Sequence, residues 1–150
     1  MTPTEKRSLR ASASFGDPAW GDEGPAGERA GSPPELAVLR RDVSRAAGRP
    51  LVMRQSASSR ARGYARRPGL AGVTGRGTAT PEHVIRTKRV PLIGRDVDAY
   101  AAAYRAYVDA HRDRVPGGLQ PIDPAPRVIL DPELGLLTTV FGIHQLAVED

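Results

Sequence analysis

The chain has 150 residues, a net charge of +5 and a hydrophobic fraction of 39%, enough for one domain with a modest core. It contains no cysteine, which excludes disulfides and thiolate metal sites. It has neither the apolar stretch of a secretory signal nor the run of roughly 18 apolar residues that a membrane-spanning helix needs. We therefore predict a cytoplasmic protein without a membrane partner.

The first 34 residues contain five Gly and five Pro and show neither helical nor strand periodicity. Such a segment cannot bury enough apolar surface to offset the entropy of the chain. We predict a disordered leader or linker over residues 1–34.

A first helix and a first strand are predicted directly after this leader. Apolar residues recur at helical spacing from Leu36 to Ala46, and Gly48 and Pro50 end the pattern. Residues 51–53 are apolar and predict a short buried strand. The order helix then strand is typical of an α/β arrangement.

The next stretch carries weaker signals. Residues 56–67 predict a second helix, although their Ser, Arg and Gly residues leave little to bury, and Pro68 ends it. Residues 69–77 are Gly-rich and predict a flexible loop. A phosphate-binding loop would need a closing Gly-Lys-Ser/Thr, which does not follow.

An extended segment and a long helix are predicted next. Residues 84–90 are apolar and basic and predict an extended segment that Pro91 closes. Residues 96–111 predict the clearest helix of the chain, because Asp96 can cap it and three tyrosines form a stripe at helical spacing. Such a stripe indicates a core face rather than a ligand platform.

The last pattern is a β-hairpin. Residues 127–130 predict a strand, residues 131–135 have the Asp-Pro-Glu-Leu-Gly composition of a turn, and residues 136–141 predict the returning strand. The complete pattern predicts the α/β class, with a small incomplete mixed sheet, flanking helices and a C-terminal β-hairpin.

Positive charge is concentrated in residues 54–90, which hold nine Arg or Lys residues and one acid, Glu82. The balance of +8 in this run could attract phosphates or nucleic acid. Only one aromatic residue, Tyr64, lies inside it, so the run lacks the stacking platform that single strands need. A solvated basic surface is the favoured interpretation, and a nucleic-acid partner is disfavoured.

The residues that we select as a tentative anion or substrate site are Thr80, His83, Arg86 and Lys88. A guanidinium, an ammonium, a hydroxyl and an imidazole within nine residues could hold a phosphate or carboxylate. If the segment is extended, Arg86 and Lys88 share a face. An exposed basic strand edge that resists aggregation explains the same residues equally well.

Other catalytic patterns are missing from the sequence. The three histidines lack the close spacing of a zinc site, and neither a Gly-x-Ser-x-Gly elbow nor a dinucleotide fingerprint occurs. We therefore assign no catalytic residue, no metal ligand and no cofactor to this chain.

Five stretches in order make the chain similar to the central region of the bifunctional class II aldolase/short-chain dehydrogenase proteins, of the rhamnulose-1-phosphate aldolase/alcohol dehydrogenase type. The motif Thr-Pro-Glu-His-Val-Ile-Arg-Thr-Lys at residues 80–88 is the most specific part of the resemblance. The matching stretches are residues 39–51, 64–68, 77–92, 100–107 and 123–138.

The resemblance implies a parent protein with lyase and oxidoreductase activity in carbohydrate metabolism. Its aldolase part would hold a divalent metal with histidines, and its Rossmann part would bind NAD(P) and carry a Tyr-x-x-x-Lys pair, which this chain lacks. We expect a piece without either active site that is not catalytic alone, from a protein acting on sugar phosphates or hydroxyaldehydes. A stand-alone basic module that binds nucleic acid or another anion is the alternative.

The resemblance also divides the chain into a leader over residues 1–34, the family region over 35–139, and a divergent tail over 140–150. The change at Val140 indicates a truncation, a frameshift or a gene remnant. Loss of the helix that the family has there would uncover an apolar face of the hairpin and favour association.

Overall fold

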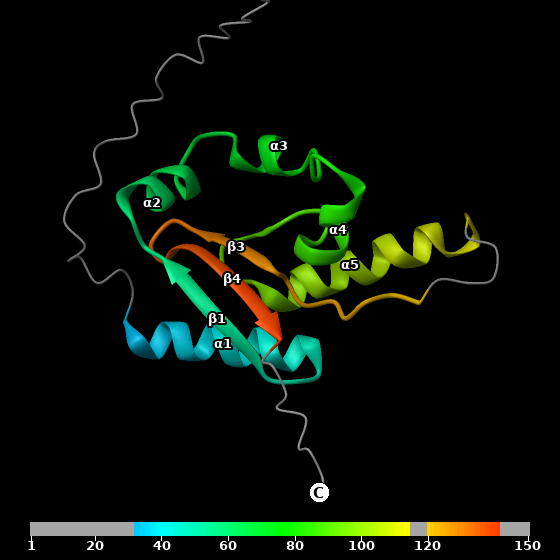
Figure 1. Cartoon of the computed structure of the whole chain (residues 1–150), viewed down its shortest axis with the longest axis horizontal. Helices are drawn as coiled ribbons and strands as arrows, with labels where there is room; N and C mark the ends of the chain where they lie inside the picture. The colour runs from blue at the N-terminus through cyan, green and yellow to red at the C-terminus, as the bar shows by residue number, and fades with distance from the viewer. Residues whose placement is uncertain (1–31, 115–119, 142–150) are drawn as a thin grey trace, which may run out of the picture.

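The computed structural model describes residues 32–114 and 120–141 (Figure 1). The predicted leader therefore lies outside the described residues except for 32–34, and the predicted tail does so except for 140–141. The helices are α1 (Pro33–Ala47), α2 (Ser59–Ala65), α3 (Leu70–Thr74), α4 (Pro81–Thr87), α5 (Val97–His111) and the 3₁₀ turn η1 (Arg112–Arg114). The strands are β1 (Leu51–Ser56), β2 (Leu92–Ile93), β3 (Val128–Asp131) and β4 (Gly135–Phe141). Among these helices, none is long and apolar enough to cross a membrane.

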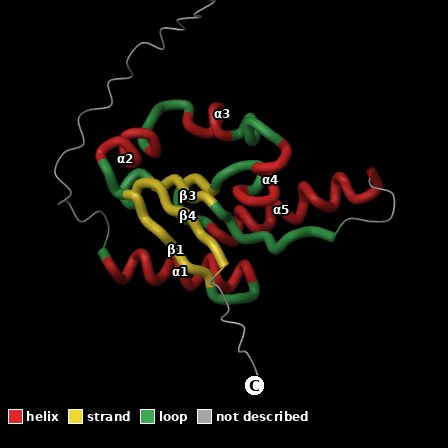
Figure 2. The backbone as a smooth tube through the Cα atoms, viewed as in Figure 1, coloured by secondary structure: helices red, strands yellow, loops and turns green. Residues whose placement is uncertain are grey.

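The four strands form one mixed sheet in the order β1-β4-β3-β2, and Figure 2 labels β1, β4 and β3 of it. β4 is antiparallel to both of its neighbours, and β3 with β4 forms the predicted C-terminal hairpin. β2 is parallel to β3, with α5 in the connection between them, because parallel neighbours need a crossover. The prediction of an α/β fold with a small mixed sheet and flanking helices is confirmed.

The main core lies between one face of the sheet and helices α1 and α5. Side chains alternate between the faces of a strand, so Leu51, Ile129 and Leu137 all point to this face. They meet Leu39 of α1 and Val97 of α5, and all five side chains are nearly inaccessible to solvent. Their burial supplies most of the hydrophobic stabilisation of the domain.

The opposite face of the sheet is covered more thinly. Leu130 of β3 packs there with Ala65 of α2 and Leu70 of α3 in a second, smaller cluster. Toward the β1 edge the cover ends, and Val52 and Val140, which pair across β1 and β4, are 51% and 59% exposed. The two faces are therefore packed unequally.

The predicted helices at either end of the main core are confirmed. α1 begins with Pro33 at its first position, the carboxylate of Glu35 accepts a hydrogen bond from the backbone N–H of Ser32 at 2.8 Å, and Gly48 closes the helix with φ +70°. In α5 the side chain of Asp96 accepts a hydrogen bond from the N–H of Ala99, as predicted.

Two predictions for the middle of the chain are wrong. Residues 84–90 do not form an extended segment, because α4 occupies Pro81–Thr87 with Pro81 in its first turn, extended Thr80 before it and Glu82 near its N-terminus. Residues 69–77 are not entirely loop, because Leu70 anchors the short helix α3 in the second cluster. Burial of that leucine outweighs the low helix propensity of its glycine neighbours.

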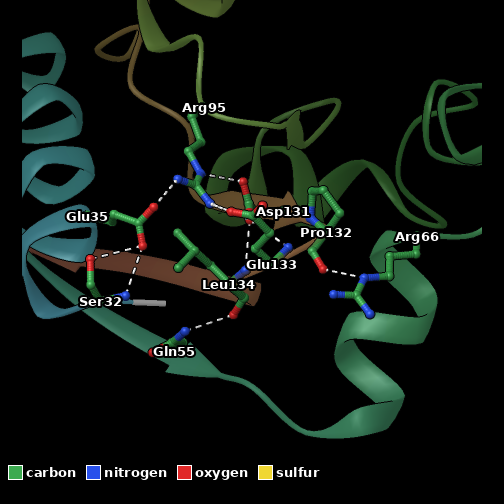
Figure 3. A network of polar contacts seen from close by, with 9 residues as sticks. All are labelled: Ser32, Glu35, Gln55, Arg66, Arg95, Asp131, Pro132, Glu133 and Leu134. Atoms are coloured by element: carbon green, nitrogen blue, oxygen red, sulfur yellow. Dashed lines mark hydrogen bonds and ion pairs between the residues drawn. The ribbon is translucent and has the colours of Figure 1, made fainter. Parts of the chain in front are cut away.

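An ion-pair network ties three distant segments together at one end of the sheet (Figure 3). Arg95, which follows β2, donates to Asp131 at the end of β3, to Glu35 of α1 at 3.0 Å and to Glu133 of the hairpin turn at 2.6 Å. Asp131 in turn accepts hydrogen bonds from the backbone N–H groups of Glu133 and Leu134. The network fixes the hairpin turn against α1 and the start of α5.

Candidate functional site

The basic run of the sequence folds over the thinly covered face of the sheet. Its residues form the end of β1, helices α2, α3 and α4, and their connections, which lie on the same side of the sheet in Figure 1. Nine Arg or Lys residues against one acid make this layer strongly positive. The rest of the chain is net negative, so the layer is the natural place for an anion to approach.

Beneath this layer is a cavity of about 720 Å³. Val128, Leu130 and Leu136 of the central strands β3 and β4 form an apolar floor. The walls come from the end of β1, from α2 and the residue before it, from the end of α3, and from the end of α4 and the residues that flank it. They consist of Ser56, Ser58, Arg60, Ala61, Tyr64, Val73, Thr74, Gly77, Thr78, Thr87, Lys88, Arg89 and Pro91. The size is within the range of small-molecule sites, roughly 300–1,000 Å³.

The charges in the cavity wall are all of one sign. Among the described residues that line it, Arg60, Lys88 and Arg89 are charged and none is Asp or Glu. The guanidinium of Arg89 lies 4.9 Å from the ring centroid of Tyr107 on α5, and this cation–π contact orients the Arg89 side chain. Cationic side chains beside an apolar floor favour an anionic ligand over a cationic one.

Three threonine hydroxyls of the wall donate to backbone carbonyls. Thr74 donates to the carbonyl of Leu70 at 2.9 Å, Thr78 to that of Thr80 at 2.9 Å, and Thr87 to that of His83 at 2.8 Å. A hydroxyl that has donated its single proton keeps only acceptor lone pairs. While these bonds are kept, the three threonines offer acceptor lone pairs to a ligand.

The four residues predicted as an anion site do not gather at one point. Thr80 and His83 are hydrogen-bonded to each other through Oγ1 and Nδ1 at the start of α4, and Arg86 is exposed on the same helix. Lys88 is 2% exposed and lines the cavity. Residues 81–87 are helical and not extended, so the strand alternation that would place Arg86 and Lys88 on one face does not apply. Anion binding by the four residues stays a prediction.

The ammonium of Lys88 is held in a polar cluster between α4 and α5. Its Nζ donates to the backbone carbonyl of Asp123 and lies 4.3 Å from the ring centroid of Tyr104. The carboxylate of Asp123 bonds instead to Arg127, which is only 7% exposed. Desolvation by burial lowers the pKa of Lys88 to about 8. The positive charge of Arg127 also lowers the pKa, and the attraction of Asp123, which raises it, does not compensate.

This cluster could not be found from the sequence. Asp123 lies in a Pro-rich stretch that predicts a loop, Arg127 begins a predicted strand, and Tyr104 belongs to a stripe interpreted as core. The one available signal is the i, i+4 spacing of an acid and an arginine, which outside a helix predicts no contact. Lys88 is also the one non-glycine residue with positive φ, +66°, within the described ranges 32–114 and 120–141.

No group of three His, Cys, Asp or Glu side chains able to hold a metal occurs in the described part of the chain. The described residues therefore do not fit the divalent metal that the resemblance implies for the aldolase part of the parent protein. What these residues do build is a positively charged cavity with an apolar floor and acceptor groups in its wall.

Comparison with known proteins gives a family for the chain. No curated protein and no solved structure matches the chain. A family described as "Aldolase class II, second domain" matches residues 32–145, which include every helix and strand of the structure and extend beyond β4. The match covers well over half of the chain, and the chain belongs to the class II aldolase second-domain family.

Proposed function

We propose that this domain is a non-catalytic part of a cytoplasmic, bifunctional class II aldolase/short-chain dehydrogenase system that acts on sugar phosphates or hydroxyaldehydes. One observation carries the proposal: the family match covers the whole described fold, and the family is by its description a second domain. A second domain implies a companion that performs the aldol chemistry. In this proposal the companion parts bind the divalent metal and NAD(P).

The uncovered apolar pair Val52 and Val140 supplies the surface for such a companion. The two side chains oppose each other across β1 and β4 and so form one patch, beside the edge of the sheet. Exposed apolar side chains next to an unpaired strand edge are typical of contact surfaces. We assign association with the companion domain to this patch.

The second contact in this proposal is polar. Thr80, His83 and Arg86 line the exposed side of α4, where a phosphate of a substrate bound to the companion, or a carboxylate of the companion itself, could meet them. Lys88 follows α4, and the hydrogen bond from its ammonium to the carbonyl of Asp123 connects the end of this helix to the loop before β3.

Co-expression with the products of the flanking reading frames tests the proposal. The expected result is co-elution in gel filtration, with metal-dependent aldol cleavage and NAD(P) reduction in the complex and neither activity in the 150-residue chain alone. Val52→Asp should weaken co-elution, whereas Val38→Asp, an exposed substitution on α1, should not. Turnover of a sugar phosphate by the isolated chain would refute the non-catalytic role.

A second candidate function is suggested by the charge of the layer over the cavity. Nine cations and one acid on one side of the sheet are compatible with a stand-alone module that binds nucleic acid or another anion. Affinity for duplex DNA that falls steeply with salt would favour this function over the first. Absence of DNA binding at low salt would eliminate it.

A further inference from the structure

The cavity beneath α2, α3 and α4 exposes apolar side chains to solvent. Its floor consists of Val128, Leu130 and Leu136, which belong to the two central strands of the sheet. Val73 of α3 continues this apolar surface into the wall and is 39% exposed. Apolar surface in contact with water favours an occupant that removes it from water. The centre of the cavity therefore fits a large apolar group.

Two guanidinium groups beside this cavity carry uncompensated positive charge. Arg54 lies two residues before the lining residue Ser56 and therefore on the same face of β1. Arg76 lies between the lining residues Thr74 and Gly77, in another part of the wall. Both arginines are exposed, and neither forms an ion pair with any described residue. An occupant with carboxylates on either side of its apolar group would complement this rim.

One segment of the leader has that composition. Residues 17–28 contain four acids, neither Lys nor Arg, and Trp20, the only tryptophan of the chain. Asp17 precedes Trp20 by three positions, and Asp22 and Glu23 follow it by two and three. Linkers that stay unstructured for lack of apolar surface are poor in aromatic residues. A tryptophan flanked by acids thus indicates a short binding motif within the leader.

The leader joins the fold at the same end of the sheet as the basic layer. Ser32 is bonded to Glu35, which belongs to the network around the hairpin turn. Arg66, directly after α2, donates to the carbonyl of Pro132 in that turn at 2.6 Å (Figure 3). Trp20 stands twelve positions before Ser32, a reach of up to about 40 Å, whereas a domain of this size has a radius of gyration of only about 13 Å. A tether of this length gives an effective concentration in the millimolar range, so weak docking is sufficient.

We propose that residues 17–28 dock on the basic layer of their own chain, with the indole of Trp20 in the cavity and the flanking carboxylates at its cationic rim. Hydroxyl oxygens in the wall, among them that of Thr87, can accept a hydrogen bond from the indole N–H. The inference goes beyond the proposed function, because it assigns an occupant to the cavity from the chain itself. It holds whether or not a companion aldolase exists, and the two claims fail separately.

Fluorescence of the full chain tests the proposal, because Trp20 is the only tryptophan. At low salt the emission should be blue-shifted from that of the urea-unfolded chain, and acrylamide should quench it about threefold less, since the indole is removed from water. Neither value should depend on the protein concentration. Native and unfolded chains with the same emission would overturn the proposal. A blue shift that appears only at high protein concentration would overturn it as well, because it would show docking between two copies.

Substitutions in the fold locate the docking surface. Arg54→Glu combined with Arg76→Glu should return the emission and quenching of Trp20 to those of the unfolded chain, because like charges then face each other. Val73→Glu places a carboxylate in the apolar lining and should also expose the indole. Arg41→Glu, an exposed position on α1 across the sheet, is the control and should change neither value. An indole that stays buried in a folded Val73→Glu variant would refute its place in the cavity.

Substitutions in the leader test the pairing of charges. Asp22→Lys combined with Glu23→Lys should expose Trp20, whereas Glu5→Lys, which reverses an acid outside the segment, should not. Adding the two arginine substitutions at the rim to this lysine pair should restore the blue shift, because opposite charges again face each other. Circular dichroism confirms that each variant is folded. Wild-type fluorescence in either double variant, or no recovery in the combined variant, would refute the docking of these acids on this rim.

Discussion

Arg95 holds both oxygens of the Asp131 carboxylate, with Nε 2.7 Å from Oδ2 and Nη2 3.1 Å from Oδ1. The side chain of Asp131 is 4% exposed, so hydrogen bonds from protein groups must replace the water that would otherwise solvate this carboxylate. The same guanidinium reaches Glu35 and Glu133, which are more exposed. The pair is the centre of the network that positions the hairpin.

Arg95→Ala should therefore destabilise the domain by about 3 kcal/mol, because it leaves a buried carboxylate without its counter-charge. The control is Arg45→Ala, which breaks an ion pair with Asp98 whose side chains are 60% and 80% exposed and should cost below about 0.5 kcal/mol. Urea unfolding of both variants provides the comparison. Equal losses would show that the Arg95 pair behaves as a surface pair.

Acid should unfold the wild type through the same pair. Burial alone would raise the pKa of Asp131, but the hydrogen bonds from Arg95 and from the backbone N–H groups of Leu134 and Glu133 outweigh it and hold the pKa below its ordinary value. The folded state thus binds fewer protons, and this stability is present above the unfolded pKa and is lost as pH falls through the folded one. Asp131→Asn, followed by urea midpoints from pH 6 down to about 3, should show a shallower decline than wild type.

The free energy of unfolding should also depend on pH on the alkaline side, because the fold lowers the pKa of a buried lysine. The pKa of Lys88 is about 8 in the fold against 10.5 in the unfolded chain, so stability rises with pH between these values, by up to about 3 kcal/mol. Burial also raises the pKa of Tyr100 to about 12, which removes stability above pH 10, so the measurement belongs at lower pH. Lys88→Met should abolish the rise in urea midpoint between pH 7 and about 9.5. A rise of the same size in the variant would assign it to another group.

Gly135 is required for a close approach between β4 and the end of β1. Its φ is +82°, and a β-carbon there would lie 2.5 Å from the carbonyl oxygen of Ser56. Gly48 also has positive φ, +70°, but a β-carbon there would meet no atom within 4 Å. Gly48→Ala should thus cost only the backbone strain, about 1 kcal/mol, whereas Gly135→Ala should cost roughly 3 kcal/mol or more. Thermal unfolding of the two variants distinguishes strain alone from strain with a clash.

Sequence reasoning predicted the elements with strong local signals. α1 and α5 each have a helical apolar pattern and an end marked by a capping residue or glycine, and the Asp-Pro-Glu-Leu-Gly turn defines the hairpin. The strand β2 was missed because two residues carry no periodicity. α4 was mistaken for a strand because its apolar residues Val84 and Ile85 remain exposed in the fold and show no helical stripe.

Of the candidate site, the sequence predicted only its excess of positive charge. Composition located the basic run, but the cavity beneath it depends on how far α2 and α3 stand from the sheet, which no local pattern encodes. The position of Lys88 in that wall likewise depends on contacts with Asp123 and Tyr104, which are distant in the sequence. Tertiary contacts of this kind override the local preferences on which sequence reasoning relies.

The sheet order has a consequence for synthesis of the protein. β1 is made early and, among the described strands, pairs only with β4, the last of them, so the backbone of Leu51 cannot find its partner until Phe141 has been made. One of the two central strands of the sheet, β4, therefore leaves the ribosome after the described helices that pack on the sheet. Closing so long a loop is slow, and until then β1 exposes an unsatisfied edge. Nascent chains of this domain should depend on chaperones up to the moment when β4 emerges.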